Sequence, residues 1–145
     1  MIRTLFLLLT LSAANTCDHA ALPNVYLATS QSWSGGAAGS GHGTRFLIYL
    51  NANECKGIAF DSLWVNMKRL PANVLTSRND TLIVEAENFV RGILPEGYPN
   101  DQPETAPVEF PVSSSGSGLL GGMVKRDRIY VSIPYWKILP HLAYP

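Results

Sequence analysis

The stretch that decides the fold class is TRFLIYLNANECKGIAFDSLWVNMKRLP, residues 44–71. Its first part, Thr44–Leu50, alternates with the period of two that a strand requires, so that a phenylalanine and two aliphatic residues share one face. Residues with turn chemistry follow, and Ile58–Met67 then forms a further strand with large apolar groups on both faces. Such a strand is typical of the centre of a two-layer β structure.

Strict alternation in this third strand places Phe60, Ser62 and Trp64 on one face and Leu63 and Val65 on the other. We expect Trp64 to be a core residue, because most tryptophans in a small β domain are buried.

Working outward, β-branched and aromatic residues between turn signals predict further strands. These segments are Val25–Trp33, Val74–Leu75, Thr81–Phe89, Leu119–Val124 and Arg128–Ile133. Thr81–Phe89 would also present one apolar helix face, but its Thr-Leu-Ile-Val start and missing capping box favour a strand. Lys68–Pro71 is expected to end the third strand, and the apolar tail 135–145 is expected to dock on the body.

About seven short strands with turns between them predict an all-β fold, an antiparallel β-sandwich that is broadly immunoglobulin-like. The Cys–Trp–Cys spacing of true immunoglobulin domains is absent. We expect one domain over residues 23–145, preceded by an N-terminal tail over 15–22. Prolines recur every four residues from Pro95 to Pro111, which excludes a helix or a central strand and predicts a long loop over 95–118.

The first residues predict export. Arg3 is followed by the apolar run Leu5–Leu11 and then by Ser12, Ala13 and Ala14, the pattern of a signal peptide over residues 1–14. The apolar run is too short to span a bilayer, so no transmembrane span is expected after cleavage. The predicted location is secreted, periplasmic or in the cell envelope.

Two cysteines, Cys17 and Cys55, remain after the predicted cleavage. In an oxidising compartment they could form one disulfide bond. Alternatively, Cys17 could carry a lipid anchor, although the preceding Ala-Asn-Thr departs from the usual Leu-Ala-Gly pattern. The two hypotheses exclude each other.

Eleven Lys and Arg residues balance eleven Asp and Glu residues, which disfavours nucleic acid as a partner. The glycine-rich stretch 35–43 is followed by a predicted strand and not by a helix, so we interpret it as a turn and not as a phosphate-binding loop. No cofactor and no metal site are expected. The carboxylates Glu96, Asp101, Glu104 and Glu109 are interpreted as solvating the long loop, with calcium binding as the alternative.

No motif places an activated nucleophile beside a base, so catalytic residues are not expected. Convergence of His42, Asp101 and Glu104 in one pocket would favour an enzyme or a metal site.

Aromatic residues near predicted strand ends or in loops give a weak signal for ligand binding. Trp33, Tyr98, Tyr135 and Trp136 could form an exposed surface for a glycan or a protein if at least two of them are exposed and roughly coplanar.

Three segments carry a resemblance: GIAFDSLWVNMKRLP at 57–71, NDTLIVEAENF at 79–89 and RIYVSIPYWKILPHLAYP at 128–145. Within residues 44–145 the chain resembles small exported β-proteins of Bacteroidota cell envelopes, whose function is generally unassigned. The resemblance implies no active-site residues. We therefore expect a non-enzymatic binding or structural accessory module of the cell envelope, whose partner is another envelope protein or a glycan. The alternatives are a carbohydrate-binding module and a small metal-dependent or hydrolytic enzyme.

Overall fold

The computed structural model describes residues 21–37, 39–92 and 106–145, and of residues 76–78 only the backbone. The described chain is all-β. It contains β1 (Val25–Ser34), β2 (His42–Asn51), β3 (Ile58–Val65), β4 (Lys68–Arg78), β5 (Thr81–Val90), β6 (Gly118–Val124), β7 (Asp127–Ile133) and β8 (Lys137–Ala143). Within these residues no helix is long and apolar enough to cross a membrane.

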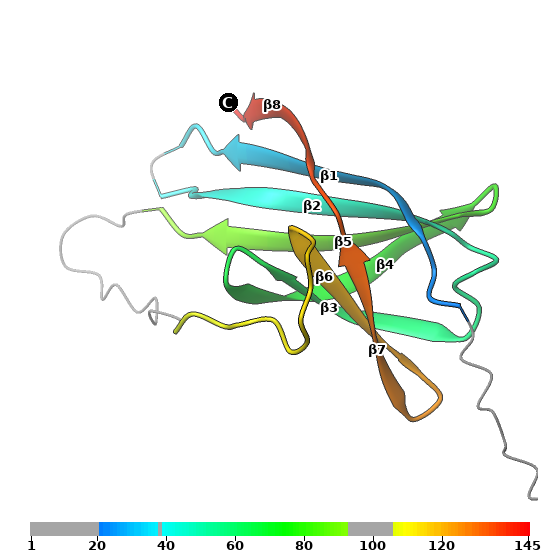
Figure 1. The fold of residues 1–145 in the computed structure, drawn as a ribbon. Coiled ribbons are helices and arrows are strands. Elements are labelled where there is room, and N and C mark those ends of the chain that lie inside the picture. Colours follow the sequence, from blue (N-terminus) through cyan, green and yellow to red (C-terminus); the bar gives the residue numbers. More distant parts are fainter. Residues whose placement is uncertain (1–20, 38, 93–105) are drawn as a thin grey trace, which may run out of the picture.

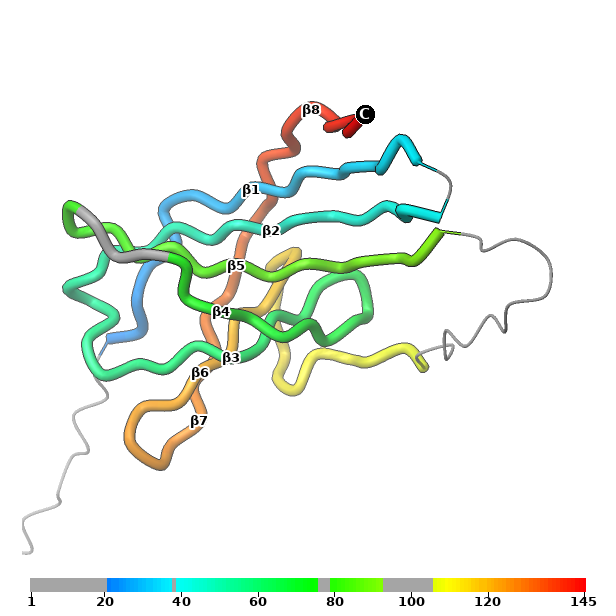
Figure 2. Tube along the Cα trace, turned by 180° about the vertical axis from the view of Figure 1, so that it is seen from behind, coloured from blue at the N-terminus to red at the C-terminus, as the bar shows by residue number. Residues whose placement is uncertain are grey.

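The eight strands form one mixed, strongly curled open sheet in the order β7-β6-β3-β4-β5-β2-β1-β8. The predicted two-sheet, immunoglobulin-like sandwich is therefore wrong. Figures 1 and 2 show β6 and β7 crossing the direction of β1, β2 and β5, so the sheet folds over its own inner face as a half-barrel. Every neighbouring pair is antiparallel except β1 and β8, which run parallel.

The physical reason for the single sheet lies in β4. Its first residues, Lys68–Pro71, pair with β3, and its later residues, from Ala72 onward, pair with β5. Proline has no backbone N–H to donate and is tolerated where a strand's pairing is interrupted, so Pro71 fits the point at which β4 changes partner. The sequence analysis predicted that the strand ends at Lys68–Pro71. In the structure these residues instead begin the strand that joins both halves of the sheet.

Two-residue hairpins produce the sharp reversals on either side of β4. Asn66 and Met67 both have positive φ, at 50° and 57°, and so do Asn79 and Asp80, at 47° and 63°. Positive φ at both central residues is the signature of the type I′ turn, whose twist matches that of the flanking strands.

Most of the predicted strands are confirmed, including Thr81–Phe89, which lies within β5. The predicted strands Leu119–Val124 and Arg128–Ile133 correspond to β6 and β7, and the tail docks through β8 beside β1. Val74–Leu75 is part of the longer β4.

The core fills the inner side of the curled sheet. Its buried residues are Ala28, Phe46, Ile48, Leu50, Cys55, Phe60, Leu63, Val65, Leu70, Ala72, Val84, Ala86, Leu120, Val131 and Ile133. Trp64 is buried, with 6% of its surface exposed, but it does not belong to this cluster.

A β-bulge explains the position of Trp64. The register of β3 against β6 shifts between Phe60 and Ser62. An extra residue reverses the alternation beyond it. As a result Phe60, Leu63 and Val65 all reach the core, whereas the sequence analysis placed Phe60 on the face opposite the other two.

Candidate functional site

The outer face of the sheet, opposite the core, carries a row of aromatic side chains near the ends of β1 and β5. In the strand register, Gly43 of β2 lies between Trp33 of β1 and Phe89 of β5. A Cβ atom at Gly43 would lie 3.0 Å from both Nε1 and Cε2 of Trp33. The indole of Trp33 therefore lies close over Gly43, because the glycine has no side chain to occupy this position on β2.

Three rings meet at this position. The planes of Trp33 and Phe89 are nearly parallel, at 21°, with ring centroids 5.8 Å apart. Tyr144 meets Trp33 edge-on, at 73° and 6.1 Å. Phe89 and Tyr144 are about half exposed, at 51% and 52%. Phe89 and Tyr144 therefore present apolar ring surface to solvent.

Polar groups hold and border these rings. The indole Nε1 of Trp33 donates to Oε1 of Glu87 at 2.7 Å. Arg45 forms an ion pair with Glu85, through its Nε and Oε1. Together with Gln31, Leu142 and Tyr144 these residues line a hollow of about 360 Å³, which we call the Trp33 hollow. Its size is at the lower end of the range of about 300–1,000 Å³ for small-molecule sites.

β8 and the residues after it form one side of the hollow and are held to β1 by specific hydrogen bonds. The backbone N–H of Tyr144 donates to the carbonyl of Ser34 at 2.9 Å, and the Gln31 amide donates to the carbonyl of Pro140 at 2.9 Å. His141 lies between two hydroxyl groups, with Nδ1 3.0 Å from Ser32 Oγ and Nε2 2.9 Å from Ser34 Oγ. The C-terminal strand is thus an integral part of the hollow.

The glycine-rich stretch forms a turn, as predicted, and it also lets the C-terminal segment lie against it. It connects β1 directly to β2, and Gly39 and Gly41 have positive φ of 81° and 79°. A Cβ atom at Gly36 would lie 2.6 Å from the carbonyl oxygen of Tyr144. The small residue therefore allows the C-terminal backbone to approach the loop closely.

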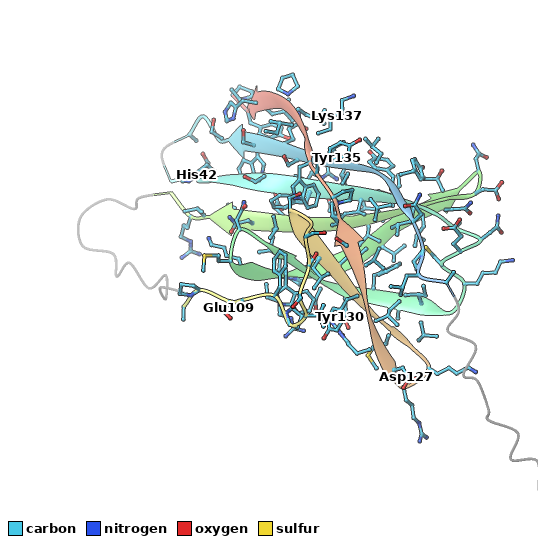
Figure 3. The ribbon with its side chains drawn as sticks, viewed as in Figure 1. His42, Glu109, Asp127, Tyr130, Tyr135 and Lys137 are labelled. Carbon is cyan, nitrogen blue, oxygen red and sulfur yellow. The ribbon has the colours of Figure 1, made fainter. Side chains whose placement is uncertain are left out.

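Of the four aromatic residues predicted to bind a ligand, Trp33 alone lines the hollow among those that the structure describes. Trp136 packs edge-on against the core residue Phe46, with centroids 5.0 Å apart, and donates its indole N–H to the carbonyl of Ser117 at 3.3 Å. Tyr135 is 68% exposed and lies where the chain crosses from β7 to β8 (Figure 3). Tyr98 lies outside the described residues.

A second polar cluster covers Trp64 on the outer face of the other half of the sheet. Arg128 binds Asp61 with two hydrogen bonds of 2.6 Å, and this contact lowers the pKa of the Asp61 carboxyl and raises that of Arg128. The guanidinium carbons of Arg69 and Arg128 lie 5.3 Å and 5.7 Å from the Trp64 ring centroid. Ser62 Oγ accepts from both arginines and donates to Asp61. These side chains provide hydrogen-bond partners for one another, so we interpret the cluster as structural and call it the Trp64 clasp.

Cys55 is a buried free thiol in this structure, with 6% of its surface exposed, and its predicted partner Cys17 lies outside the described residues. Burial, aided by the nearby Glu54, raises the pKa of the Cys55 thiol to about 11.

Asp101 and Glu104, whose convergence with His42 would favour an enzyme or a metal site, lie outside the described residues, as does Glu96. His42 is exposed at the start of β2, where it pairs with Ser34 and Val90. No group of three His, Cys, Asp or Glu side chains in the described part of the chain is arranged to hold a metal ion.

A larger hollow, of about 880 Å³, lies at the opposite edge strand. Residues 21–23 and the β6–β7 hairpin, with Val124 and Ile129, form most of its walls, and Ile58 of β3 also lines it. The polar side chains there are Glu54, Lys56, Lys125, Asp127 and Arg128.

Comparisons with protein-family models, with curated proteins and with solved structures gave no match to this chain. The site must therefore be interpreted from its own geometry.

Sequence reasoning missed Gln31, Arg45, Glu87, Phe89 and Tyr144. In β5, Glu85 and Glu87 alternate with the buried Val84 and Ala86 and therefore lie on the outer face. The missing information was the pairing of β5 with β2 and of β8 with β1, which no local pattern contains.

Proposed function

We propose that this chain is a non-catalytic binding module whose ligand is a saccharide, bound at the Trp33 hollow. The observation that carries the proposal is the group of three aromatic rings beside the carboxylate of Glu87, in which Phe89 and Tyr144 are about half exposed and flank the partly buried Trp33. Pyranose rings combine apolar C–H faces with hydroxyl groups at their edges. Aromatic rings bordered by a few fixed polar groups suit both parts of such a ligand.

The polar rim supports the same ligand class. Glu87 and Glu85 provide acceptors, and Arg45 and Gln31 provide donors, within one open hollow. Sugar hydroxyls both donate and accept hydrogen bonds, so a mixed set of donors and acceptors is suited to them. We further propose that the module is exported and works in the cell envelope or outside the cell, as the N-terminal pattern 1–14 predicts.

The test is titration of the purified protein with soluble polysaccharides, followed by intrinsic tryptophan fluorescence and by calorimetry. Binding should perturb the fluorescence of Trp33, and Trp33→Ala should weaken affinity about 30-fold, the effect of losing about 2 kcal/mol at an aromatic anchor. Trp33→Phe should abolish the fluorescence change and retain part of the affinity. Tyr135→Ala removes an exposed ring outside the hollow and should bind like the wild type.

Circular dichroism of each variant confirms that it is folded. Failure of every polysaccharide to bind the folded wild type, or full affinity in Trp33→Ala, would refute the proposal.

A hydrolytic enzyme is the second candidate, and one observation favours it. Nε2 of His141 is 2.9 Å from Ser34 Oγ, within the range for a nucleophile and its base, and Ser32 holds the other ring nitrogen. Labelling with a fluorophosphonate distinguishes the two functions. If the chain is an enzyme, the reagent should modify Ser34 in the wild type and should fail to modify it in the His141→Phe variant. A binding module would remain unlabelled.

We also propose that Cys17 and Cys55 form a disulfide bond in the exported protein. The backbone N–H of Asn24 donates to Glu54 Oε2 at 2.9 Å, which fixes the N-terminal segment beside Cys55. Seven Cα–Cα steps lead from Cys17 to Asn24 and can extend to about 23 Å, so the chain is long enough for the pairing. Intact-mass measurement with and without reductant tests the bond, and an added acyl mass would instead show a lipid anchor at Cys17.

A further inference from the structure

The charges that line the Trp33 hollow are unequal. Its side chains include one cation, Arg45, and two carboxylates, Glu85 and Glu87. Arg45 is paired with Glu85, so these two charges largely cancel. Arg91, which follows the end of β5, and Lys137, the first residue of β8, do not line the hollow.

Glu87 is therefore the carboxylate without a cationic partner in the hollow. Its residue is exposed, and Oε1 is held at 2.7 Å by the indole N–H of Trp33. The indole donor is neutral and fixes the carboxylate beside the aromatic surface without removing its charge. An ionised carboxylate only accepts hydrogen bonds, so it binds sugar hydroxyls as donors and repels a carboxylate or sulfate group of a ligand.

We infer that the saccharide bound at the Trp33 hollow is uncharged, and that Glu87 is the residue that discriminates against acidic saccharides. This inference rests on the proposed function, because it names the ligand class of the same site. A second negative charge about 6 Å from Glu87, in a water-like environment, corresponds to about a threefold loss of affinity. The effect is larger at low salt and is multiplied when a polymer places several acidic groups near the site.

The experiment compares matched neutral and acidic polymers on the same backbone. Hydroxyethylcellulose is paired with carboxymethylcellulose, dextran with dextran sulfate, and carboxyl-reduced pectin with polygalacturonate. Affinities are measured by calorimetry at 20 mM and 500 mM NaCl. The wild type should bind the neutral member of a recognised pair at least threefold more tightly at low salt, and the difference should shrink at high salt.

Glu87→Gln tests the residue itself. The amide oxygen can still accept the indole hydrogen bond, so the aromatic surface stays in place while the charge is removed. This variant should gain at least threefold in affinity for the acidic polymer and change less than twofold for the neutral one. Glu109→Gln removes the same charge from the segment before β6, far from β8 (Figure 3), and should leave both affinities unchanged.

The outcomes separate the two proposals. Equal or tighter binding of the acidic polymers by the wild type, or an unchanged preference in Glu87→Gln, overturns the inference and leaves saccharide binding standing. Binding of neither class overturns the proposed function and the inference with it.

Discussion

Replacing Arg128 with alanine should destabilise the protein far more than a surface arginine normally does. Arg128 makes two hydrogen bonds of 2.6 Å to Asp61, a third of 3.2 Å to Ser62, and lies over the rings of Trp64 and Tyr130. The Arg128 side chain is 27% exposed and that of Asp61 43%, so solvent screens the ion pair in part.

The expected loss can be worked from these contacts. A partly exposed pair with two-point geometry falls at the upper end of the surface range, at about 1 kcal/mol. The stacking on Trp64 and Tyr130 adds about 0.5–1 kcal/mol. Exposure of the Trp64 indole, which Arg128 helps to cover, adds a few tenths more, so the free energy of unfolding should fall by about 2 kcal/mol. For a chain of this length that corresponds to a fall in Tm of roughly 6–8 °C.

Urea denaturation at pH 7 measures the change, with Arg128→Lys and Arg45→Ala as controls. Lysine keeps the charge but cannot bind both carboxylate oxygens side by side, so about half of the loss should remain. Arg45 also forms an ion pair, but its side chain is 47% exposed and lies over no aromatic ring of the described residues, so its removal should cost less than about 1 kcal/mol. A double-mutant cycle with Asp61→Asn isolates the pair itself. A loss below 0.5 kcal/mol in Arg128→Ala, or equal losses for Arg128 and Arg45, would refute the view that Trp64 is held by a clasp.

Three further predictions concern groups in other environments. The pKa of Asp61 is lowered below its ordinary 3.8, so the ionised carboxylate stabilises the fold fully above pH 3.8 and this stabilisation is lost as the pH falls through the lower folded pKa. The urea midpoints at pH 5 and pH 2.5 should therefore differ more in the wild type than in Asp61→Asn. Burial raises the pKa of the Cys55 thiol to about 11, against an ordinary 9.0. In a Cys17→Ser variant at pH 8, Cys55 should therefore react with a disulfide reagent at least about 100-fold more slowly in the folded protein than in the urea-unfolded protein. Equal rates would contradict the burial of Cys55. Ile48→Ala empties a fully buried core position and should lower the free energy of unfolding by about 2–5 kcal/mol in a denaturant titration, whereas a loss below 1 kcal/mol would mean that the core is misplaced.

The strand positions could be predicted from the sequence because period-two alternation and turn residues are local signals. Their assembly could not, and β4 shows why. Lys68–Pro71 contains charges and a proline, a combination that usually ends a strand, yet these residues pair with β3. Which strand lies next to Ala72 is decided by long-range pairing with β5, and that single change of partner turns two expected sheets into one.

The face of each side chain was predictable only where the alternation is uninterrupted. In β2 the residues predicted to share one face, Phe46, Ile48 and Leu50, are all in the core. In β3 the bulge between Phe60 and Ser62 moves Trp64 to the outer face. A bulge inserts a residue without changing composition or hydrophobicity, so the pattern that predicts the strand contains no sign of it.

The same limit applies to the site and links it to the fold. Trp33 stands out in the sequence as an aromatic residue next to a glycine-rich stretch, but its role depends on Gly43 opposite it and on Phe89 across that glycine. The third ring, Tyr144, reaches the hollow because β8 joins the sheet parallel to β1, which an antiparallel sandwich would not provide. An open edge normally invites unwanted strand pairing, and here β8 covers the edge of β1 and supplies one wall of the hollow. The curled single sheet is thus the feature that forms the Trp33 hollow, and the binding function proposed for it depends on the C-terminal strand remaining docked.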